Sequence, residues 1–293
     1  SARTMPWRSE PSPYRVWLSE IMLQQTRVEA VIPYFLRFVR AIPDISALAA
    51  ASEEQLHKLW EGLGYYSRVR NLQKAAKQIM ERYDGALPPS YELLLDLCGI
   101  GPYTAGAIAS IAFGIPVPAV DGNVLRVLSR IFASEADIGA ATVKKEYQEL
   151  LYRTMPQDKP GDFNQALMEL GATVCLPNGK PKCEDCPIAF GCLGYQQGNP
   201  TLYPVKAEKK PRRTELKTVL VLCTPQGVLM HKRPSSGLLA GLWEFPNLNG
   251  HLTKQEVKDY LKSRGIQEKS IEPLKPTKHI FTHIEWQMTG YYI

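Results

Sequence analysis

The chain has 293 residues, 44% of them hydrophobic, and a formal net charge of +6. A single hydrophobic core seldom grows beyond about 250–300 residues, so we expect two domains. No apolar run approaches the roughly 20 residues that cross a bilayer, and no secretion pattern follows Ser1, so we expect a cytoplasmic protein without a membrane partner. The modest positive charge fits a nucleic-acid partner, although an ordinary solvated surface would also carry it.

The first two thirds of the chain are predicted to be almost wholly helical. Apolar residues recur at helical spacing over residues 14–42, where Pro33 is expected to begin a second helix. Short helices are expected at residues 90–98 and 104–113, on either side of a glycine-containing turn. The first domain is therefore expected to be mainly α and to occupy residues 1–194.

The composition changes from about residue 195. Residues 195–213 are rich in proline, glycine and charge and have no apolar period, which is typical of a linker. After the linker, two apolar stretches separated by "PQG" predict a β-hairpin, and a helix is expected at residues 254–264. The closing "HIFTHIEWQMTGYYI" predicts one or two strands. Residues 214–293 are therefore expected to form a second domain of the α+β class.

The stretch "LCGIGPYTAG" at residues 97–106 has Gly-Ile-Gly between the two short helices, which is the pattern of a helix-hairpin-helix motif. Glycine allows a positive φ and a close approach of the backbone to a ligand. The amides of Gly99, Gly101 and the residues up to Thr104 would face an anion such as a DNA phosphate, which the helix dipole also favours. A plain connection between two helices is the alternative interpretation.

Asp121 lies twenty residues beyond Gly101, at the head of another expected helix, "NVLRVLSRIF". Its type and position predict an N-cap. Hydrogen bonds from helix amides lower the pKa of a carboxylate, so Asp121 is expected to stay ionised and to be able to face a developing cation. An ordinary N-cap without a catalytic role is the alternative interpretation.

Four cysteines follow a C-x7-C-x2-C-x5-C pattern: Cys175, Cys183, Cys186 and Cys192. In an intracellular chain this spacing predicts a metal centre in the loop 175–192, and a disulfide is the weakest alternative. Zinc ribbons generally use two CxxC pairs, whereas this loop has one CxxC and two longer arms. The pattern therefore favours a [4Fe–4S] cluster over zinc.

The hairpin, the aspartate and the four-cysteine loop together resemble the endonuclease III superfamily of DNA glycosylases. Within it, the chain is similar to the MutY family of adenine DNA glycosylases from about Arg3 to Ile293. The resemblance is carried by long and specific motifs: "PYRVWLSEIMLQQTRVEAVIPYF", "LWEGLGYYSRVRNL", "GIGPYTAGAIAS", "VDGNVLRVLSR" and "FNQALMELGATVC".

This resemblance implies a helix-hairpin-helix glycosylase domain with an iron–sulfur loop, followed by a Nudix-like domain. It implies a monomeric enzyme that flips adenine out of double-stranded DNA when the adenine is mispaired with 8-oxoguanine or guanine. The enzyme then hydrolyses the N-glycosidic bond. In bifunctional relatives, a lysine at the position of Tyr103 attacks the sugar and cleaves the strand. Tyrosine cannot form that Schiff base, so little or no lyase activity is expected.

The resemblance also implies roles for residues that alone would read as solvated or structural. Glu20, among apolar neighbours that raise the pKa of a carboxyl, is expected to be the general acid that protonates adenine. Asp121 is expected to stabilise the sugar cation, and Asn123 to orient water or a carboxylate. Tyr103 is expected to line the site and to donate a hydrogen bond to Asp121.

Further residues are expected to contact DNA. Gln25 and Tyr65 are expected to fill the gap that the flipped base leaves, next to Leu23 at the end of the first long helix. Core packing is the alternative for the tyrosine. Arg8 is expected to contact adenine or a phosphate, and Gln165 to face the adenine pocket.

The second domain resembles the Nudix-like recognition domain of the same family. The sequence "FTH", which is Phe281, Thr282 and His283, stands where the family has an "FSH" loop that recognises 8-oxoguanine. Threonine keeps the hydroxyl group, so recognition is expected to survive. The helix "KQEVKDYLKSRG" lacks the REXXEE cluster that holds Mg²⁺ in Nudix hydrolases, which disfavours a nucleotide pyrophosphatase.

One spacing departs from the family pattern, because the first cysteine interval has seven residues where the family has six. Two further alternatives are a bifunctional glycosylase-lyase for oxidised pyrimidines and a DNA clamp without catalysis. Tyr103 and the second domain argue against the lyase. The pairing of Glu20 with Asp121 argues against the clamp.

Overall fold

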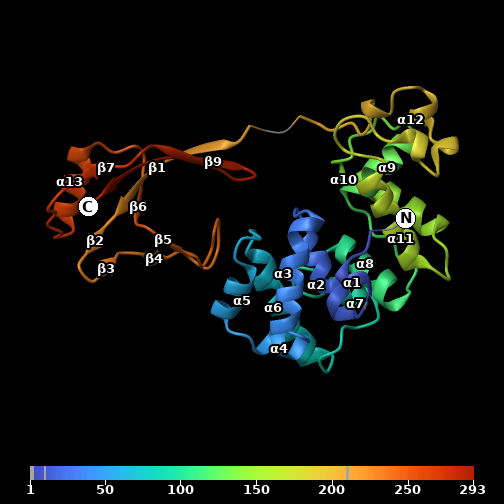
Figure 1. The fold of residues 1–293 in the computed structure, drawn as a ribbon, viewed down its shortest axis with the longest axis horizontal. Helices are drawn as coiled ribbons and strands as arrows, with labels where there is room; N and C mark the ends of the chain where they lie inside the picture. Colours follow the sequence, from blue (N-terminus) through green and yellow to red (C-terminus); the bar gives the residue numbers. More distant parts are fainter. Residues whose placement is uncertain (1–2, 10, 209–210) are drawn as a thin grey trace. The chain divides into compact units, whose positions relative to one another are not determined.

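The computed structural model describes residues 3–9, 11–208 and 211–293 and divides into two compact units (Figure 1). The first unit extends to Ala207 and the second begins at Glu208. Residues 209 and 210 of the expected linker lie outside the described residues. None of the helices in the described ranges has the length and apolar character required to traverse a membrane.

The first unit is built from helices joined by short connections, as the sequence predicted (Figure 1). In chain order these are α1 (Pro6–Ser9), α2 (Pro13–Leu23), α3 (Val28–Ala41), α4 (Ile45–Ala50), α5 (Glu53–Trp60), α6 (Ser67–Arg82), α7 (Tyr91–Leu95), α8 (Pro102–Phe113), α9 (Gly122–Ile131), α10 (Ala141–Thr154), α11 (Pro160–Thr173), the 3₁₀ turns η1 (Cys183–Asp185) and η2 (Ala189–Gly191), α12 (Leu193–Gln196) and η3 (Pro200–Leu202).

Helix α2 lies at the centre of the larger core of this unit, where it packs on α3, α6 and α8. Its apolar side chains are buried on several faces, and Trp17, Leu18 and Met22 are inaccessible to solvent. The expectation that Pro33 begins a second helix was wrong, because α3 already begins at Val28 and contains Pro33. The break comes earlier, where Gln25 takes a left-handed backbone (φ 57°).

Three glycines bring the backbones around α8, α9 and α11 into close contact. A Cβ on Gly106 would lie 2.5 Å from the carbonyl oxygen of Pro118, and one on Gly171 would lie 2.5 Å from Cβ of Asn123. A Cβ on Gly161 would lie 2.8 Å from the carbonyl oxygen of Ser110. Because no larger residue fits at these contacts, the glycines fix how closely the site-bearing helices approach one another.

Part of the segment expected to be linker is folded onto the first unit. It contains the end of α12 and all of η3, and Tyr203 is buried. The Arg130 guanidinium donates a 3.0 Å hydrogen bond to the carbonyl of Tyr203, which ties this segment to α9. Composition alone missed this because proline and glycine also occur in ordered loops that pack against a core.

The second unit has the expected α+β composition (Figure 1). Its elements are β1 (Arg213–Val221), β2 (Cys223–Thr224), β3 (Gly227–Val228), β4 (His231–Lys232), β5 (Trp243–Glu244), β6 (Asn247–Asn249), α13 (Lys254–Ser263), β7 (Glu272–Pro273), β8 (Thr277–Ile280) and β9 (Ile284–Tyr292). The main sheet has the order β6-β1-β9-β7, with β8 also paired to β9.

The two long strands of the second unit, β1 and β9, run parallel, with Arg213 opposite Ile284 and Val221 opposite Tyr292. Helix α13 buries Val257 and Leu261 against Leu220 of β1. The "PQG" turn forms the predicted hairpin only over the short β2 and β3, because the long apolar stretch before it pairs instead with β6 and β9. The closing segment forms the two strands β8 and β9, as predicted. The β8–β9 turn presents residues 281–283 at one end of the sheet.

Candidate active site

A cavity of about 960 Å³ opens in the first unit and is lined from α1, α2, α8, α11 and the start of α9. Eight residues predicted for the site lie in its wall: Arg8, Glu20, Leu23, Gln25, Tyr103, Asp121, Asn123 and Gln165. The outermost two, Arg8 and Gln165, are 157 positions apart in the chain, so the fold and not the local sequence brings these residues together. Other predicted residues lie elsewhere, as described below.

Glu20 is the buried carboxyl group of this cavity. It lies on α2 with 6% of its surface exposed. Burial raises the pKa of Glu20 from 4.5 to about 7, and the negative charge of Asp121 raises it as well. A hydrogen bond from Tyr103 and the charge of Arg8 act in the opposite direction. Glu20 therefore carries a proton over part of the neutral range, as a general acid must.

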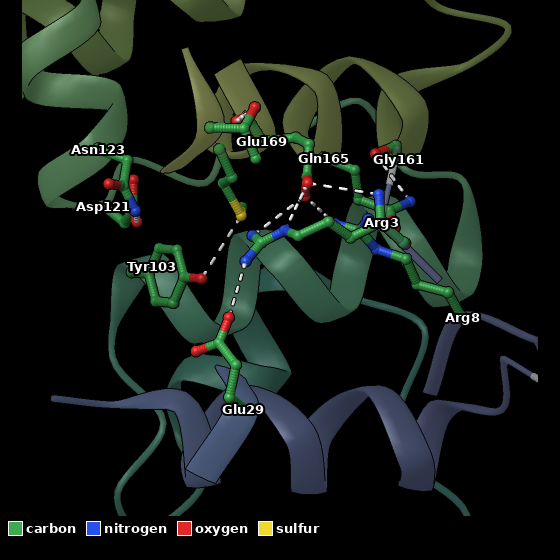
Figure 2. Close-up of polar contacts among 11 residues, drawn as sticks. Arg3, Arg8, Glu29, Tyr103, Asp121, Asn123, Gly161, Gln165 and Glu169 are labelled. Atoms are coloured by element: carbon green, nitrogen blue, oxygen red, sulfur yellow. Dashed lines mark hydrogen bonds and ion pairs between the residues drawn. The ribbon is translucent and has the colours of Figure 1, made fainter. Parts of the chain in front are cut away.

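The partner of Tyr103 differs from the prediction. Its hydroxyl donates to Oε2 of Glu20 at 2.5 Å, and not to Asp121. A second, weaker contact joins the hydroxyl to Sδ of Met168 at 3.6 Å, which Figure 2 shows as a dashed line. Burial, followed by the charges of Glu20 and Asp121, raises the pKa of Tyr103, so the phenol remains a donor at neutral pH. Tyr103 thus orients the buried acid.

Asp121 caps α9 as predicted, because its Oδ1 accepts a 2.8 Å hydrogen bond from the amide of Val124. The side chain of Asn123 donates to Oδ2 at 2.7 Å. The capping hydrogen bonds do lower the pKa of Asp121, but the expectation that this pKa lies below its ordinary value was wrong. Burial is the largest influence and raises the pKa, outweighing the opposing hydrogen bonds from Val124 and Asn123. Burial therefore raises the pKa of both Asp121 and Glu20.

Asn123 is itself held by Arg126, one turn further along α9. The Arg126 guanidinium donates to Oδ1 of Asn123 at 2.9 Å and to the carbonyl of Gly171 at 2.8 Å. Its Nε donates to the carbonyl of Cys175 at 2.9 Å. With its own oxygen occupied, the Asn123 amide group has its NH₂ directed at Asp121, so the amide orientation is determined.

Glu169 is a site residue that sequence reasoning missed. It lies on α11, one turn after Gln165, and its carboxylate receives hydrogen bonds from two arginines (Figure 2). Nε of Arg3 lies 2.6 Å from Oε1, and Nη2 of Arg8 lies 3.2 Å from Oε2. Burial would raise the pKa of Glu169, but the hydrogen bonds and charges of the two arginines lower it below its ordinary value. The predicted DNA contact Arg8 is thus fixed by a carboxylate.

Asn164 is a second missed residue, and it supports the approach to Asp121. Fully buried, it accepts a 3.0 Å hydrogen bond from the amide of Ala119 and donates to the carbonyl of Val117 at 2.9 Å. It also donates to the Ser110 hydroxyl at 2.8 Å. The segment 115–120 is therefore fastened between α8 and α11 just before Asp121. An asparagine inside an expected helix gives no sequence signal for this role.

The predicted hairpin residues lie outside the cavity. Gly99 has a φ of +78°, and a Cβ there would lie 2.7 Å from Cβ of Asn71, so the turn requires glycine. Gly101 has an extended backbone and precedes α8, and a Cβ on it would meet nothing within 4 Å. The Thr104 side chain is only 2% exposed, which leaves its main-chain amide as the group that can face an anion. The first amides of α8 have no partner within the helix.

The four cysteines of the loop 175–192 line one small cavity with Arg130. Nη1 of Arg130 lies 3.2 Å from the sulfur of Cys175, and the sulfur of Cys192 lies 3.3 Å from the Arg130 carbonyl. In the part of the chain that the structure describes, no three His, Cys, Asp or Glu side chains meet around a point that would hold a single metal ion. The four thiols nevertheless line the same small cavity.

The predicted recognition loop of the second unit is a tight turn with an aromatic base. The amide of Phe281 donates to the carbonyl of Ile284 at 2.8 Å, which closes the turn. The Phe281 ring packs edge-on against His279 at 4.5 Å and against Trp286 at 5.0 Å between centroids. Thr282 and His283 are exposed at the tip. The hydroxyl and imidazole are therefore presented to solvent on a fixed turn.

Comparison with protein families agrees with this division into two units. Residues 18–153 match the family described as HhH-GPD superfamily base excision DNA repair protein, and residues 218–293 match the NUDIX domain. A solved thermostable thymine-DNA glycosylase covers 67% of this chain and 89% of its own length, with 30% identity and a TM-score of 0.61. A non-covalent endonuclease III–DNA complex, with 22% identity and a TM-score of 0.58 over 68% of this chain and 90% of that chain, shows the same fold.

Relatives of known name extend over nearly the whole chain. The adenine DNA glycosylase of Mus musculus is 38% identical over 341 residues, covering 97% of this chain and 66% of the mouse protein. This chain thus spans slightly less than two thirds of the mouse relative. The adenine DNA glycosylase of Buchnera aphidicola subsp. Baizongia pistaciae is 34% identical over 289 residues, covering 96% of this chain and 79% of that protein. The chain belongs to the adenine DNA glycosylase family.

Proposed function

We infer that this protein is a monofunctional adenine DNA glycosylase. It acts as a monomer on double-stranded DNA and hydrolyses the N-glycosidic bond of adenine mispaired with 8-oxoguanine or guanine. The observation that carries the proposal is the buried Glu20, with a pKa near 7, in the same cavity as Asp121 and in contact with Tyr103. A DNA clamp without catalysis would have no use for two carboxyl groups desolvated in one cavity.

The first chemical task is to make adenine a better leaving group. Adenine departs poorly as an anion, and protonation of the base removes that barrier. Glu20 supplies the proton from its buried carboxyl group, and the Tyr103 hydroxyl orients the carboxyl and stabilises the carboxylate that remains. The expected contribution of such a positioned acid is about 10²–10⁴-fold in rate.

The second task is to stabilise the sugar as it becomes positive. Asp121 has one oxygen held by the α9 amide of Val124 and the other by Asn123, so its carboxylate is fixed in the wall of the cavity. A fixed negative charge in a water-poor site stabilises a developing cation without reorganisation. Water then attacks the sugar carbon and gives its proton to the Glu20 carboxylate that the first step left. No Schiff base forms, because Tyr103 has no amine.

The target base must leave the helix before it can enter the cavity. Gln25 and Tyr65 are exposed on the two neighbouring connections α2–α3 and α5–α6, which supports the proposal that they fill the vacated stack. Gln165 and Arg8, in the cavity wall, would contact the adenine. The N–H groups of Gly101, Tyr103 and Thr104 would hold a phosphate, to which Pro102 has no N–H to donate.

Recognition of the opposite base would lie with the second unit. The proposal rests on the exposed Thr282 and His283 and on the buttressing of Phe281 by Trp286. A hydroxyl and an imidazole together offer donors and acceptors for the altered edge of 8-oxoguanine.

The cysteine loop would hold the proposed [4Fe–4S] cluster through Cys175, Cys183, Cys186 and Cys192. Each thiolate of such a cluster binds a different iron, which fits four thiols around a shared cavity. The cluster would add structural cross-linking to a loop with little secondary structure. Arg126 and Arg130 join this loop to α9, whose first turn carries Asp121.

The decisive test is a single-turnover assay on a duplex with adenine opposite 8-oxoguanine, quenched with and without alkali. Strand breaks are expected only after alkali, and Glu20→Gln is expected to abolish them while DNA binding persists. Breaks without alkali would reveal a lyase nucleophile and overturn the assignment of Tyr103. Tight binding with no abasic product from the wild-type protein would leave a clamp or another target base.

A further inference from the structure

Two exposed residues, on the connections α2–α3 and α5–α6, have left-handed backbones although neither is glycine. Gln25, in the α2–α3 connection, has a φ of 57°, and Tyr65, in the α5–α6 connection, has a φ of 48°. The Tyr65 side chain is 49% exposed. Such conformations persist in other residues only where the surrounding structure holds them. Contacts with the surrounding structure must therefore stabilise both connections in these backbone conformations.

One side chain binds both connections. Arg68, at the start of α6, is only 7% exposed; its Nη1 donates to the α2–α3 connection, whereas its Nη2 donates to both connections. Nη1 donates to three carbonyls at the end of α2, those of Ile21, Met22 and Gln24, at 3.0, 2.8 and 2.6 Å. Nη2 donates to the Thr26 hydroxyl at 3.3 Å and to the carbonyls of Leu63 and Gly64 at 3.1 and 3.2 Å.

Two aromatic rings complete the enclosure of the Arg68 guanidinium. Its carbon lies 5.4 Å from the centre of the Trp60 ring and 5.5 Å from the centre of the Tyr65 ring. Trp60 Nε1 also donates to the carbonyl of Gly64 at 3.1 Å, on the same connection. The carbonyls at the C-terminus of α2 carry partial negative charge and compensate the buried cation. The guanidinium therefore contacts the residue before Gln25 and the residue before Tyr65 at once.

We propose that Arg68 is a positioning residue that sets the spacing and orientation of Gln25 and Tyr65, so that both enter the DNA stack together when the target base is extruded. The inference rests on the proposed glycosylase function. A planar fork with separate donors suits this task, whereas the single ammonium of lysine cannot reach both connections in the same geometry. The competing explanation is that Arg68 only stabilises the fold.

The test compares Arg68→Lys with the wild-type protein on two duplexes by single-turnover base release. One duplex holds the adenine in a fully stacked helix opposite 8-oxoguanine, and the other places the same adenine within a short run of mismatches that leaves it unstacked. The rate is expected to fall about tenfold or more on the stacked duplex and less than about threefold on the unstacked one. Arg82→Lys, at the exposed end of α6, is the matched control and is expected to match the wild type.

An equal loss on the two duplexes would overturn the proposal, because a partly unfolded enzyme is impaired on any substrate. A double-mutant cycle gives an independent answer. In a Tyr65→Leu background, Arg68→Lys is expected to cost less on the stacked duplex than it costs in the wild-type background, since one of the two residues it positions is gone. Additive losses would show that Arg68 does not act through Tyr65.

Two further measurements keep the inference separate from folding and from the glycosylase proposal. If circular dichroism shows that Arg68→Lys is unfolded, Thr26→Val replaces it, because this change removes one acceptor and leaves the guanidinium in place. If the wild-type protein releases no base from either duplex, the glycosylase proposal fails. The fluorescence of 2-aminopurine placed next to the adenine then tests the role of Arg68, because it reports unstacking of the DNA. It is expected to rise when the wild type binds and to rise less when Arg68→Lys binds. An equal rise contradicts the proposal.

Discussion

The hydroxyl of Tyr103 lies 2.5 Å from Oε2 of Glu20, so the residue at the hairpin helix and the buried acid of α2 form one hydrogen-bonded pair. The two residues are 83 positions apart in the chain. This pairing links the protonation of Glu20 to helix α8, which begins at the hairpin turn. Removal of the Tyr103 hydroxyl oxygen alone therefore tests how Glu20 sets the pH dependence of the enzyme.

The first prediction concerns Tyr103→Phe. The tyrosine hydroxyl stabilises the ionised form of Glu20 and lowers its pKa, so its removal is expected to raise that pKa further. Since protonated Glu20 is the active form, wild-type activity is expected to fall as the pH rises through about 7. In the variant this fall is expected at higher pH, with protein folding unchanged. Single-turnover rates from pH 5 to 9 measure it, and an unshifted profile would show that Glu20 does not set this limb.

The second prediction concerns the stability of Glu20→Gln. The folded-state pKa of Glu20 is about 7, above its ordinary 4.5, so the folded state retains a proton that the unfolded state loses between these pH values. The wild type is therefore expected to lose stability as the pH rises through this window, by on the order of 3 kcal/mol for the full shift. Because glutamine does not ionise, Glu20→Gln is expected to keep its stability over this pH range.

Thermal unfolding of the wild type and of Glu20→Gln at pH 5 and pH 8 checks this prediction. The variant is expected to be inactive, yet more stable than the wild type at pH 8 and close to it at pH 5. If the difference in stability between the two proteins is the same at both pH values, burial does not raise the pKa of Glu20 as described.

The third prediction separates the capping and catalytic roles of Asp121. Asparagine is about as good an N-cap as aspartate, so Asp121→Asn is expected to retain α9, while the hydrogen bond from Asn123 is lost because two NH₂ groups then face each other. The substitution removes the charge opposite the sugar cation, and the rate is expected to fall about 10²–10³-fold. Single-turnover base release beside circular dichroism measures both. Retention of full activity by the folded variant would reduce Asp121 to a structural cap.

The fourth prediction tests the carboxylate that holds Arg8. Glu169→Gln keeps the shape of the side chain but removes the charge that pairs with Arg3 and Arg8. Loss of this positioning is expected to slow base release about tenfold. Glu149→Gln is the matched control, because Glu149 lies exposed on α10 and its Oε1 lies 3.8 Å from Nζ of Lys145, which is exposed as well. The interpretation fails if the two variants behave alike.

The fifth prediction concerns the β8–β9 turn. His283→Ala is expected to reduce the preference for adenine opposite 8-oxoguanine over adenine opposite guanine, because the exposed imidazole is removed from a turn that stays closed. Thr282→Ser keeps the hydroxyl and is expected to retain the preference. The ratio of single-turnover rates on the two duplexes measures the effect. An unchanged ratio in His283→Ala would place discrimination elsewhere.

The sequence by itself determined the elements and the inventory of the site. Periodicity marked the helical first part, turn residues marked the hairpins of the second unit, and spacing singled out Asp121. Glu20 and Tyr103 were assigned only through the resemblance to a glycosylase family. These features are local, so they can be read from neighbours in the chain. The same locality explains the error at residues 195–203, since composition does not show whether a polar loop packs against a core.

Only the tertiary structure decided which groups face each other and how deeply they are buried. It assigned the hydroxyl of Tyr103 to Glu20 instead of Asp121, and it reversed the expected direction of the Asp121 pKa shift. It also brought Glu169 to Arg8 across 161 positions and placed Arg68 beneath two separate connections. Hydrogen-bond partners and desolvation depend on atoms that packing supplies from distant segments, and no local pattern specifies those atoms.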